Sequence, residues 1–160
     1  MPDVVVISGH PRSGSRTLRL ATAVAERIAA RRGRDPFVTV DVAEFGPALL
    51  APVNSTIGEA LLDIQDAALL IVATPTYRGS YTGALKVLLD QLPANALAGV
   101  IAVPVVTADS QPQAEVAEAF LARLLSELGA DVVDFGLTAT GSELADPDDV
   151  ADQYTTAIGL

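Results

Sequence analysis

The strongest chemical signal in the sequence is a polar segment, residues 8–17, that follows a short apolar run and precedes a stretch of helical periodicity. A junction of this kind between a strand and a helix exposes free backbone N–H groups and the positive end of the helix dipole, which together bind anions. Gly9 and Gly14 let the backbone approach a ligand closely. Polar side chains that can donate hydrogen bonds stand in the same segment: His10, Arg12, Ser13, Ser15, Arg16 and Thr17. The segment therefore predicts a phosphate site; the alternative is a serine or threonine helix cap with two incidental arginines.

Two common nucleotide-binding motifs can be tested against this segment, and neither fits. A Walker A loop places a lysine directly after its second glycine, at the position of Ser15, and the only lysine in the chain is Lys86. A dinucleotide fingerprint needs a glycine two residues after its first one, where Pro11 stands. The segment therefore favours a monophosphate held by hydroxyl groups and arginine.

The strands and helices that would position this segment follow from the apolar pattern. Short apolar runs predict five strands, at residues 4–7, 37–40, 67–73, 99–106 and 132–135. Helical spacing of apolar residues predicts helices over 18–28, 57–66, 83–92 and 114–128, and a final helix after Pro147. We expect Gly33 and Gly129 to end the first and fourth helices, and residues 43–56 to be irregular.

The strands read as continuous apolar runs rather than alternating ones, which is typical of strands buried on both faces of a parallel sheet. Strands and helices alternate along the chain, so we expect an α/β fold with helices on both faces of the sheet. In such open sheets, ligands bind beyond the carboxyl ends of the strands, where the strand order reverses. The loops after the first, third and fourth strands are therefore where we expect the chemistry: residues 9–15, 74–81 and 107–112.

Composition narrows the class of protein. The chain has 160 residues, of which 50% are hydrophobic and 19% charged, and this is typical of a single folded domain over residues 1–160. It has no cysteine and one histidine, His10, which excludes disulfides, thiolate metal ligands and multi-histidine metal sites. The net charge of −10 argues against nucleic-acid binding. No apolar run approaches the roughly 18 residues of a membrane span and no signal-peptide pattern opens the chain, so we expect a soluble cytoplasmic protein.

The second loop and the helix after it carry the most specific pattern. Residues 74–90, TPTYRGSYTGALKVLLD, resemble the signature of the NADPH-dependent FMN reductase family, in which P-x-Y, small residues, G-x-L-K and L-D recur after the third strand. Residues 9–16, GHPRSGSR, are similar to the first loop of that family, which usually begins G-S-P-R. The likeness extends over roughly residues 4–130 and is greatest to the flavin reductases of two-component alkanesulfonate monooxygenases.

This resemblance implies a flavodoxin-like three-layer sandwich with a five-stranded parallel sheet in the order 2-1-3-4-5. It also implies an NAD(P)H-dependent FMN reductase, in which a hydride passes from the nicotinamide to the flavin and reduced FMN is supplied to a partner monooxygenase. A homodimer or homotetramer is expected, with helix 83–92 near a subunit contact. Two alternatives stay open: a quinone, azo-compound or metal-oxyanion reductase that keeps its FMN, and a flavodoxin-like binding module without turnover.

FMN and NAD(P)H are expected to bind at the three loops. The FMN phosphate would contact Arg12, Ser15 and Thr17, with His10 and Arg16 beside them. The full set of expected cofactor-binding residues is Gly9, His10, Arg12, Ser15, Arg16, Thr17, Pro75, Thr76, Tyr77, Arg78, Gly79, Ser80, Thr107 and Asp109. We expect no catalytic side chain and no metal ligand, because flavin itself carries the chemistry of hydride transfer.

Several residues in and beside these loops have two interpretations. Tyr81 either belongs to the site or packs in the core, and Lys86 and Asp90, at i and i+4, either form a surface ion pair or lie at a subunit contact. The third loop lacks the Gly-Gly and His that family members often carry. Asp109 stands there instead and either disfavours the anionic reduced flavin or faces solvent. His10 stands where the family usually has serine, and we expect it to be a hydrogen-bond donor or packing element rather than a general base.

Overall fold

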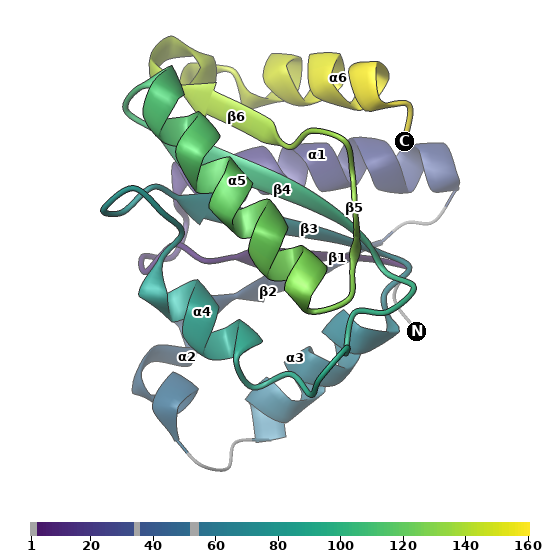
Figure 1. The fold of residues 1–160 in the computed structure, drawn as a ribbon. Helices are drawn as coiled ribbons and strands as arrows, with labels where there is room; N and C mark the ends of the chain where they lie inside the picture. Colours follow the sequence, from purple (N-terminus) through teal and green to yellow (C-terminus); the bar gives the residue numbers. More distant parts are fainter. Residues whose placement is uncertain (1–2, 34–35, 52–54) are drawn as a thin grey trace.

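A parallel β-sheet forms the centre of the computed structural model, which describes residues 3–33, 36–51 and 55–160 (Figure 1). The strands of the described residues are β1 (Val4–Ser8), β2 (Val38–Asp41), β3 (Leu69–Pro75), β4 (Ile101–Ala108), β5 (Asp131–Val132) and β6 (Leu137–Thr140). Their order is β2-β1-β3-β4-β5, and β6 also pairs with β4. All of these pairs are parallel. The predicted strand order 2-1-3-4-5 is therefore confirmed, and the order reverses between β1 and β3.

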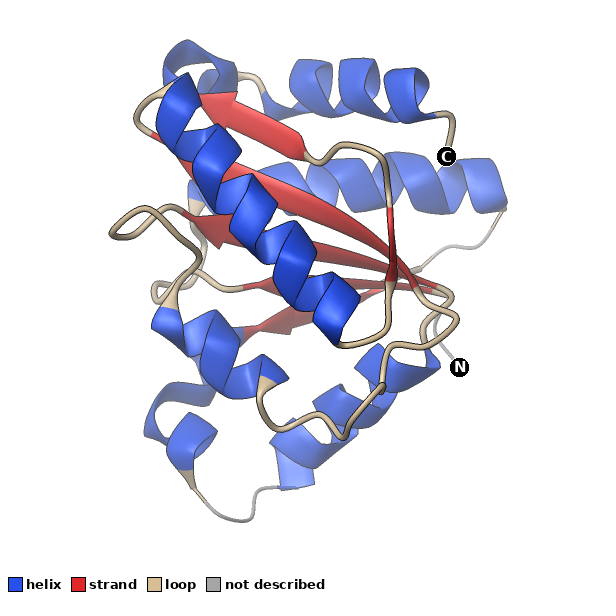
Figure 2. Ribbon diagram, in the orientation of Figure 1, coloured by secondary structure: helices blue, strands red, loops and turns tan. Residues whose placement is uncertain are grey.

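Helices cover both faces of this sheet (Figures 1 and 2). One face is covered by α1 (Arg16–Arg32) and α6 (Pro147–Ile158), which pack against each other. The other face carries α2 (Val42–Phe45), α3 (Ser55–Asp66), α4 (Gly83–Leu89) and α5 (Gln111–Glu127). The architecture is the expected flavodoxin-like α/β sandwich. No helix among the residues that the structure describes is long and apolar enough to cross a membrane.

The two faces of β1 explain why its apolar run is continuous. Val5 and Ile7 belong to the core beneath α3, α4 and α5, whereas Val4 and Val6 belong to the core beneath α1 and α6. All four side chains are at most 1% exposed. A strand with only one buried face would alternate with polar residues, so the run predicted the three-layer arrangement correctly.

Capping residues set several helix boundaries that periodicity placed a few residues away. The Ser110 hydroxyl accepts the N–H of Gln113, so α5 begins at Gln111 rather than at residue 114. Because β4 also runs to Ala108, the third loop shrinks from the predicted residues 107–112 to residues 109–110. Gly33 adopts a φ of 66° directly after α1 and ends it as predicted.

Two further predictions need correction. The segment 43–56 is not wholly irregular: Asp41 caps the short helix α2, a 3₁₀ turn Gly46–Leu50 follows, and α3 begins at Ser55. Residues 52–54 of that segment lie outside the described residues. The helix predicted over 83–92 is shorter, since α4 ends at Leu89.

The edge of the sheet beyond β4 also differs from the prediction of one strand at residues 132–135. It consists of β5 and β6, which pair with the two ends of β4. Val132 lies opposite Ala102 and Leu137 lies opposite Val105, so this edge carries two more residues than β4 over the same interval. The predicted strand falls mostly on the bulge between β5 and β6, and the prediction was wrong there.

Pro104 of β4 explains the break. Val133 donates its N–H to the carbonyl of Ala102 at 3.1 Å, but Pro104, the next residue of β4 that faces this edge, has no N–H to continue the ladder. Gly136 packs so closely on Pro104 that a Cβ would lie 2.7 Å from the Pro104 carbonyl oxygen. The N–H of Gly136 is donated instead to the carboxylate of Glu118 on α5, at 3.1 Å.

Candidate functional site

A pocket of about 420 Å³ opens at the carboxyl ends of β1, β3 and β4, the edge at which the sheet topology predicts a ligand site. The first loop and the start of α1 contribute His10, Arg12, Ser13, Gly14, Ser15, Arg16 and Thr17. The loop after β3 contributes Pro75, Thr76 and Tyr77, and the end of β4 contributes Thr107, Ala108 and Asp109. Leu144 completes the lining. Four segments far apart in the sequence therefore form one pocket.

The first loop leaves an open anion-binding end on α1. The Ser15 hydroxyl accepts the N–H of Leu18 at 3.1 Å and so caps the helix, as the alternative interpretation of this serine proposed. Because α1 begins at Arg16, the N–H groups of Arg16 and Thr17 have no acceptor within the helix and point toward its N-terminal end. No acidic side chain stands in the first turn of α1 to compete with a bound anion.

The single histidine is held firmly beside that end. His10 is only 8% exposed, and its Nδ1 accepts the backbone N–H of Arg12 at 3.0 Å. Its ring meets the ring of Tyr77 edge to face, with the centroids 6.2 Å apart. Burial, and then the positive charge of Arg12, lower the pKa of His10 below its usual value. His10 is therefore a neutral imidazole at pH 7.

Two buried hydroxyl groups join α1 to β4 at the pocket. Thr17 Oγ1 and Thr107 Oγ1 lie 2.9 Å apart in a hydrogen bond that either can donate. The carbonyl of Thr107 accepts a further bond from Thr76 Oγ1 at 2.9 Å, which ties in the loop after β3. The two hydroxyl groups carry two protons, and their mutual hydrogen bond uses one. The second proton can be donated to a ligand.

The loop after β3 brings only some of its predicted residues to the pocket. Tyr77 and Ser80 exchange two backbone hydrogen bonds, of 2.9 and 3.2 Å, around a tight turn made by Arg78 and Gly79. Arg78 has a φ of 52° and Gly79 a φ of 80°, which is the left-handed backbone that a two-residue hairpin turn requires. Arg78, Gly79 and Ser80 do not line the pocket, so a contact between them and a cofactor stays a prediction.

Gly9 lies beneath the pocket and connects the first two loops. Its N–H is donated to the carbonyl of Ala73 at 2.8 Å, and its own carbonyl accepts the hydroxyl of Thr82 at 2.6 Å. A Cβ at this position would lie 2.7 Å from the Cβ of Leu85. Glycine is therefore needed for the packing of the loop on α4, and a contact between Gly9 and a cofactor stays a prediction.

The residues with two interpretations can now be placed. Tyr81 is partly buried against the core, and Lys86 and Asp90 form an ion pair of 2.7 Å on one turn of the α4 region. Asp109 is exposed and lines the pocket at the third loop, after β4. Tyr77 lines the same pocket from the loop after β3.

Four residues of the pocket lining were not among the expected cofactor contacts: Ser13, Gly14, Ala108 and Leu144. Ser13 and Gly14 stand within the loop that the sequence singled out. Leu144 belongs to a 3₁₀ turn, Gly141–Ala145, that follows the undetected strand β6. Thr140 and Glu143 form a capping box at that turn, and this T-x-x-E pattern is the sequence signal that predicts it.

The donor set fits a phosphorylated ligand with a flat ring. Arginine side chains, hydroxyls and a helix N-terminus gather at one end of the pocket, and an aromatic ring with proline stands at the loop after β3. No group of three or more histidine, cysteine or acidic side chains that could hold a metal ion occurs within the described part of the chain. The arrangement therefore suits FMN, whose phosphate and isoalloxazine need these two environments.

Comparisons with known proteins agree with this chemistry. The model of the family described as NADPH-dependent FMN reductase matches residues 2–143. The NADH-dependent FMN reductase SfnF of Pseudomonas putida is 34% identical over 142 residues, which cover 86% of this chain and 76% of that protein. The FMN reductase (NADPH) of Escherichia coli (strain K12) is 34% identical over 150 residues, which cover 89% of this chain and 75% of that protein.

Solved structures give the same result. The apo form of the NADH:FMN oxidoreductase EMOB superposes with a TM-score of 0.80 at 32% sequence identity, over 99% of this chain and 90% of that one. An oxidoreductase from Corynebacterium diphtheriae also reaches a TM-score of 0.80, at 27% identity, over 99% of this chain and 97% of that one. The chain therefore belongs to the NADPH-dependent FMN reductase family and is a flavin reductase.

Proposed function

We propose that the pocket described above binds FMN, that NAD(P)H reduces this FMN there, and that the reduced flavin leaves to serve a partner monooxygenase. One observation carries the proposal: the donor-rich N-terminus of α1 and the Tyr77 loop line the same pocket. Neither environment alone would suit FMN, because the first binds only an anion and the second only a ring.

The phosphate end is assigned to the first loop. Arg12 supplies positive charge at the mouth, and the N–H groups of Arg16 and Thr17 point toward the same end. The hydroxyls of Ser15 and Thr17 are each used inside the protein, yet each can serve a ligand as well. The Ser15 hydroxyl accepts the Leu18 N–H and can still donate its own proton to a ligand. The Thr17–Thr107 pair likewise has one hydroxyl proton that is not used in their mutual bond.

The ring end is assigned to Pro75, Thr76 and Tyr77 on one side and to Thr107 and Asp109 on the other. When bound, FMN would supply the redox chemistry by accepting a hydride from the nicotinamide. The protein's share is to hold the ring at the Tyr77 loop, to leave one ring face open to NAD(P)H, and to exclude water. This division of work needs no catalytic side chain.

The release of reduced FMN separates the proposal from its main alternative, a quinone, azo-compound or metal-oxyanion reductase that retains FMN. The pocket supports release because Arg12, Arg16 and Tyr77 at its mouth are all exposed. FMN would then behave as a substrate with a saturating concentration rather than as a tightly held group.

The test uses protein freed of flavin. NADPH and NADH oxidation are measured with increasing FMN, and rapid filtration under anaerobic conditions then separates protein from free reduced flavin. We expect oxidation to rise and saturate with FMN, and most reduced flavin to pass the filter. Oxidation without dependence on added FMN, with flavin retained on the protein, would favour the alternative reductase. Absence of any FMN-dependent oxidation would contradict the proposal.

A further inference from the structure

The imidazole of His10 contacts both ends of the pocket. On one side Nδ1 accepts the backbone N–H of Arg12, the residue assigned to the phosphate. On the other side the ring packs edge to face against Tyr77, the residue assigned to the flavin ring. The backbone N–H of His10 is donated to Ser8 Oγ at 3.4 Å, and the residue is only 8% exposed, so these contacts hold the side chain between the two loops.

We propose that His10 is a positioning residue that couples the two ends of the FMN pocket, by fixing the Arg12 backbone through Nδ1 and seating the Tyr77 ring through its own ring. The inference rests on the proposed function for its ligand. The contacts that carry it are formed without ligand. A displacement of the Arg12 loop is therefore transmitted to Tyr77 through one rigid side chain.

The hydrogen bond to Nδ1 also fixes the tautomer. Since Nδ1 accepts, the proton of the neutral ring is on Nε2. Nε2 has no partner among the described residues, and it is not a buried atom left without one, so it is open to solvent. Because His10 lines the pocket, we infer that Nε2–H points into it and adds a donor beside Arg12.

The charges around His10 keep it in this state. Burial, and then the positive charges of Arg12 and Arg16, lower the pKa of His10. The carboxylate of Asp109, in the third loop, lines the same pocket but is exposed. A proton on Nδ1 would break the bond to the Arg12 N–H, so only the neutral ring is compatible with the observed loop.

A serine at this position could make only one of the two contacts that His10 makes. Its hydroxyl can accept an N–H two residues on, as serine does in local turns, but it is too short to meet the ring of Tyr77. The chain therefore has at residue 10 the side chain that adds a contact with the second loop. This predicts that the acceptor and the ring of His10 can be separated by mutation.

Two matched variants separate them. His10→Asn keeps an acceptor near the position of Nδ1 and removes the ring, whereas His10→Phe keeps a ring and removes the acceptor. Each is titrated with FMN and with riboflavin, alone and combined with Tyr77→Leu. We expect His10→Phe to weaken FMN about 2- to 10-fold more than riboflavin, the size of one lost hydrogen bond. We expect His10→Asn to weaken both flavins by similar factors.

The combined variants test the coupling. If His10 seats Tyr77, the effects of His10→Asn and Tyr77→Leu on riboflavin are not additive, and the double variant binds much as Tyr77→Leu does. Fully additive effects, or a His10→Phe variant that treats both flavins alike, would overturn the proposal.

A measurement without ligand distinguishes this inference from the proposed function. In ¹⁵N NMR of the flavin-free protein, the single histidine should show an unprotonated Nδ1 and a protonated Nε2 at pH 7, and the Arg12 amide should shift in His10→Phe but much less in His10→Asn. The opposite tautomer would overturn the role of His10 even if FMN binds normally. Failure of the wild-type protein to bind FMN, with the expected tautomer present, would overturn only the function.

Discussion

Tyr77 is the side chain on which the ring end of the site depends. It lines the pocket and is 45% exposed, so its ring is free to meet a flat ligand. We expect Tyr77→Ala to weaken FMN and riboflavin equally, by about 0.5–1.5 kcal/mol, because both flavins carry the same ring. Phe120→Ala is the control, since Phe120 is 49% exposed on α5 and does not line the pocket. Fluorescence titration measures both; a loss confined to FMN would place Tyr77 at the phosphate instead.

Asp109 places a carboxylate at the rim of the same pocket. A negative charge near the flavin disfavours its anionic reduced form, so Asp109→Asn should raise the midpoint potential of bound FMN and tighten reduced FMN relative to oxidised FMN. Redox titration of the wild type and the variant checks this. Equal potentials would show that the exposed carboxylate faces solvent and does not act on the ring.

The lowered pKa of His10 has a consequence for stability. Below pH 6.5 the unfolded chain protonates its histidine, while the folded protein, with its lower pKa, does not. The unfolded state then binds more protons, so the free energy of unfolding falls as the pH drops below 6.5. Because His10 is the only histidine, His10→Asn should abolish this part of the slope between about pH 5.5 and 7 in urea unfolding. Identical slopes would contradict the burial of a neutral imidazole.

The sequence predicted which types of residue form the site better than it predicted the hydrogen bonds that these residues make. Glycine, hydroxyl and arginine side chains before a helix are a local pattern, and His10 and residues 12–17 of that segment do line the pocket. The bond between Thr17 and Thr107 spans 90 positions, and no local pattern reports it. Arg78 and Gly79 form the turn that presents Tyr77, a role that no local pattern reported, and their contact with the cofactor stays a prediction.

At the scale of elements, the bulge between β5 and β6 is the feature with the sharpest test. A methyl group at Gly136 would lie 2.7 Å from the Pro104 carbonyl oxygen and 2.9 Å from the Pro104 Cβ. We expect Gly136→Ala to lower the free energy of unfolding by about 1–3 kcal/mol. Gly58→Ala is the matched control: Gly58 lies inside α3 with open space around it, and alanine should raise stability there by about 0.5–1 kcal/mol. Equal effects of the two variants would contradict this account of the bulge.

The same bulge shows why the fold was predictable and this edge was not. Strands β1, β3 and β4 are buried on both faces, so their apolar runs stand out in the sequence. The edge strand is interrupted by the missing N–H of Pro104, a residue about 30 positions earlier in the chain, and its apolar run is correspondingly short. Helix ends were likewise misplaced where a cap such as Ser110 decided them.

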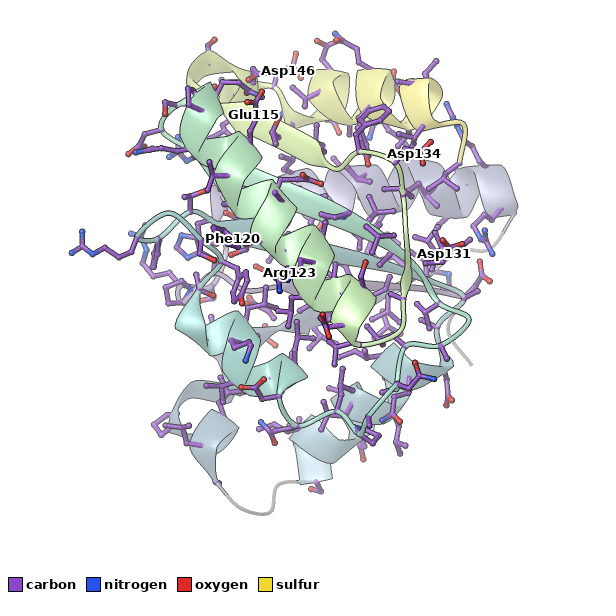
Figure 3. All side chains as sticks on the ribbon, viewed as in Figure 1. Glu115, Phe120, Arg123, Asp131, Asp134 and Asp146 are labelled. Atoms are coloured by element: carbon purple, nitrogen blue, oxygen red, sulfur yellow. The ribbon has the colours of Figure 1, made fainter. Side chains whose placement is uncertain are left out.

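At the scale of the whole molecule, the oligomeric state is the open prediction. Val116 and Phe120 expose 50% and 49% of their surface on α5, and Phe120 and Arg123 are on its outer side (Figure 3). Apolar side chains grouped on one helix face are typical of protein contacts. We expect a homodimer or homotetramer in solution. The family resemblance implies a contact near α4, although Leu85, Leu88 and Leu89 of that helix are buried in the core. Light scattering that gives a stable mass near the 16.5 kDa of one chain, with and without FMN, would contradict this expectation.

Binding of FMN in this pocket depends first on its phosphate lying at the first loop. The most direct measurement is a titration of FMN and of riboflavin, which lacks the phosphate, into the wild type, Arg12→Ala and the control Arg19→Ala. Arg19 is also exposed on α1 but does not line the pocket. We predict that Arg12→Ala weakens FMN by about 1.5–3 kcal/mol, the range for a hydrogen bond to a charged group, and that riboflavin and the control are little affected. Equal weakening of both flavins by Arg12→Ala would contradict the assignment of the phosphate to this loop.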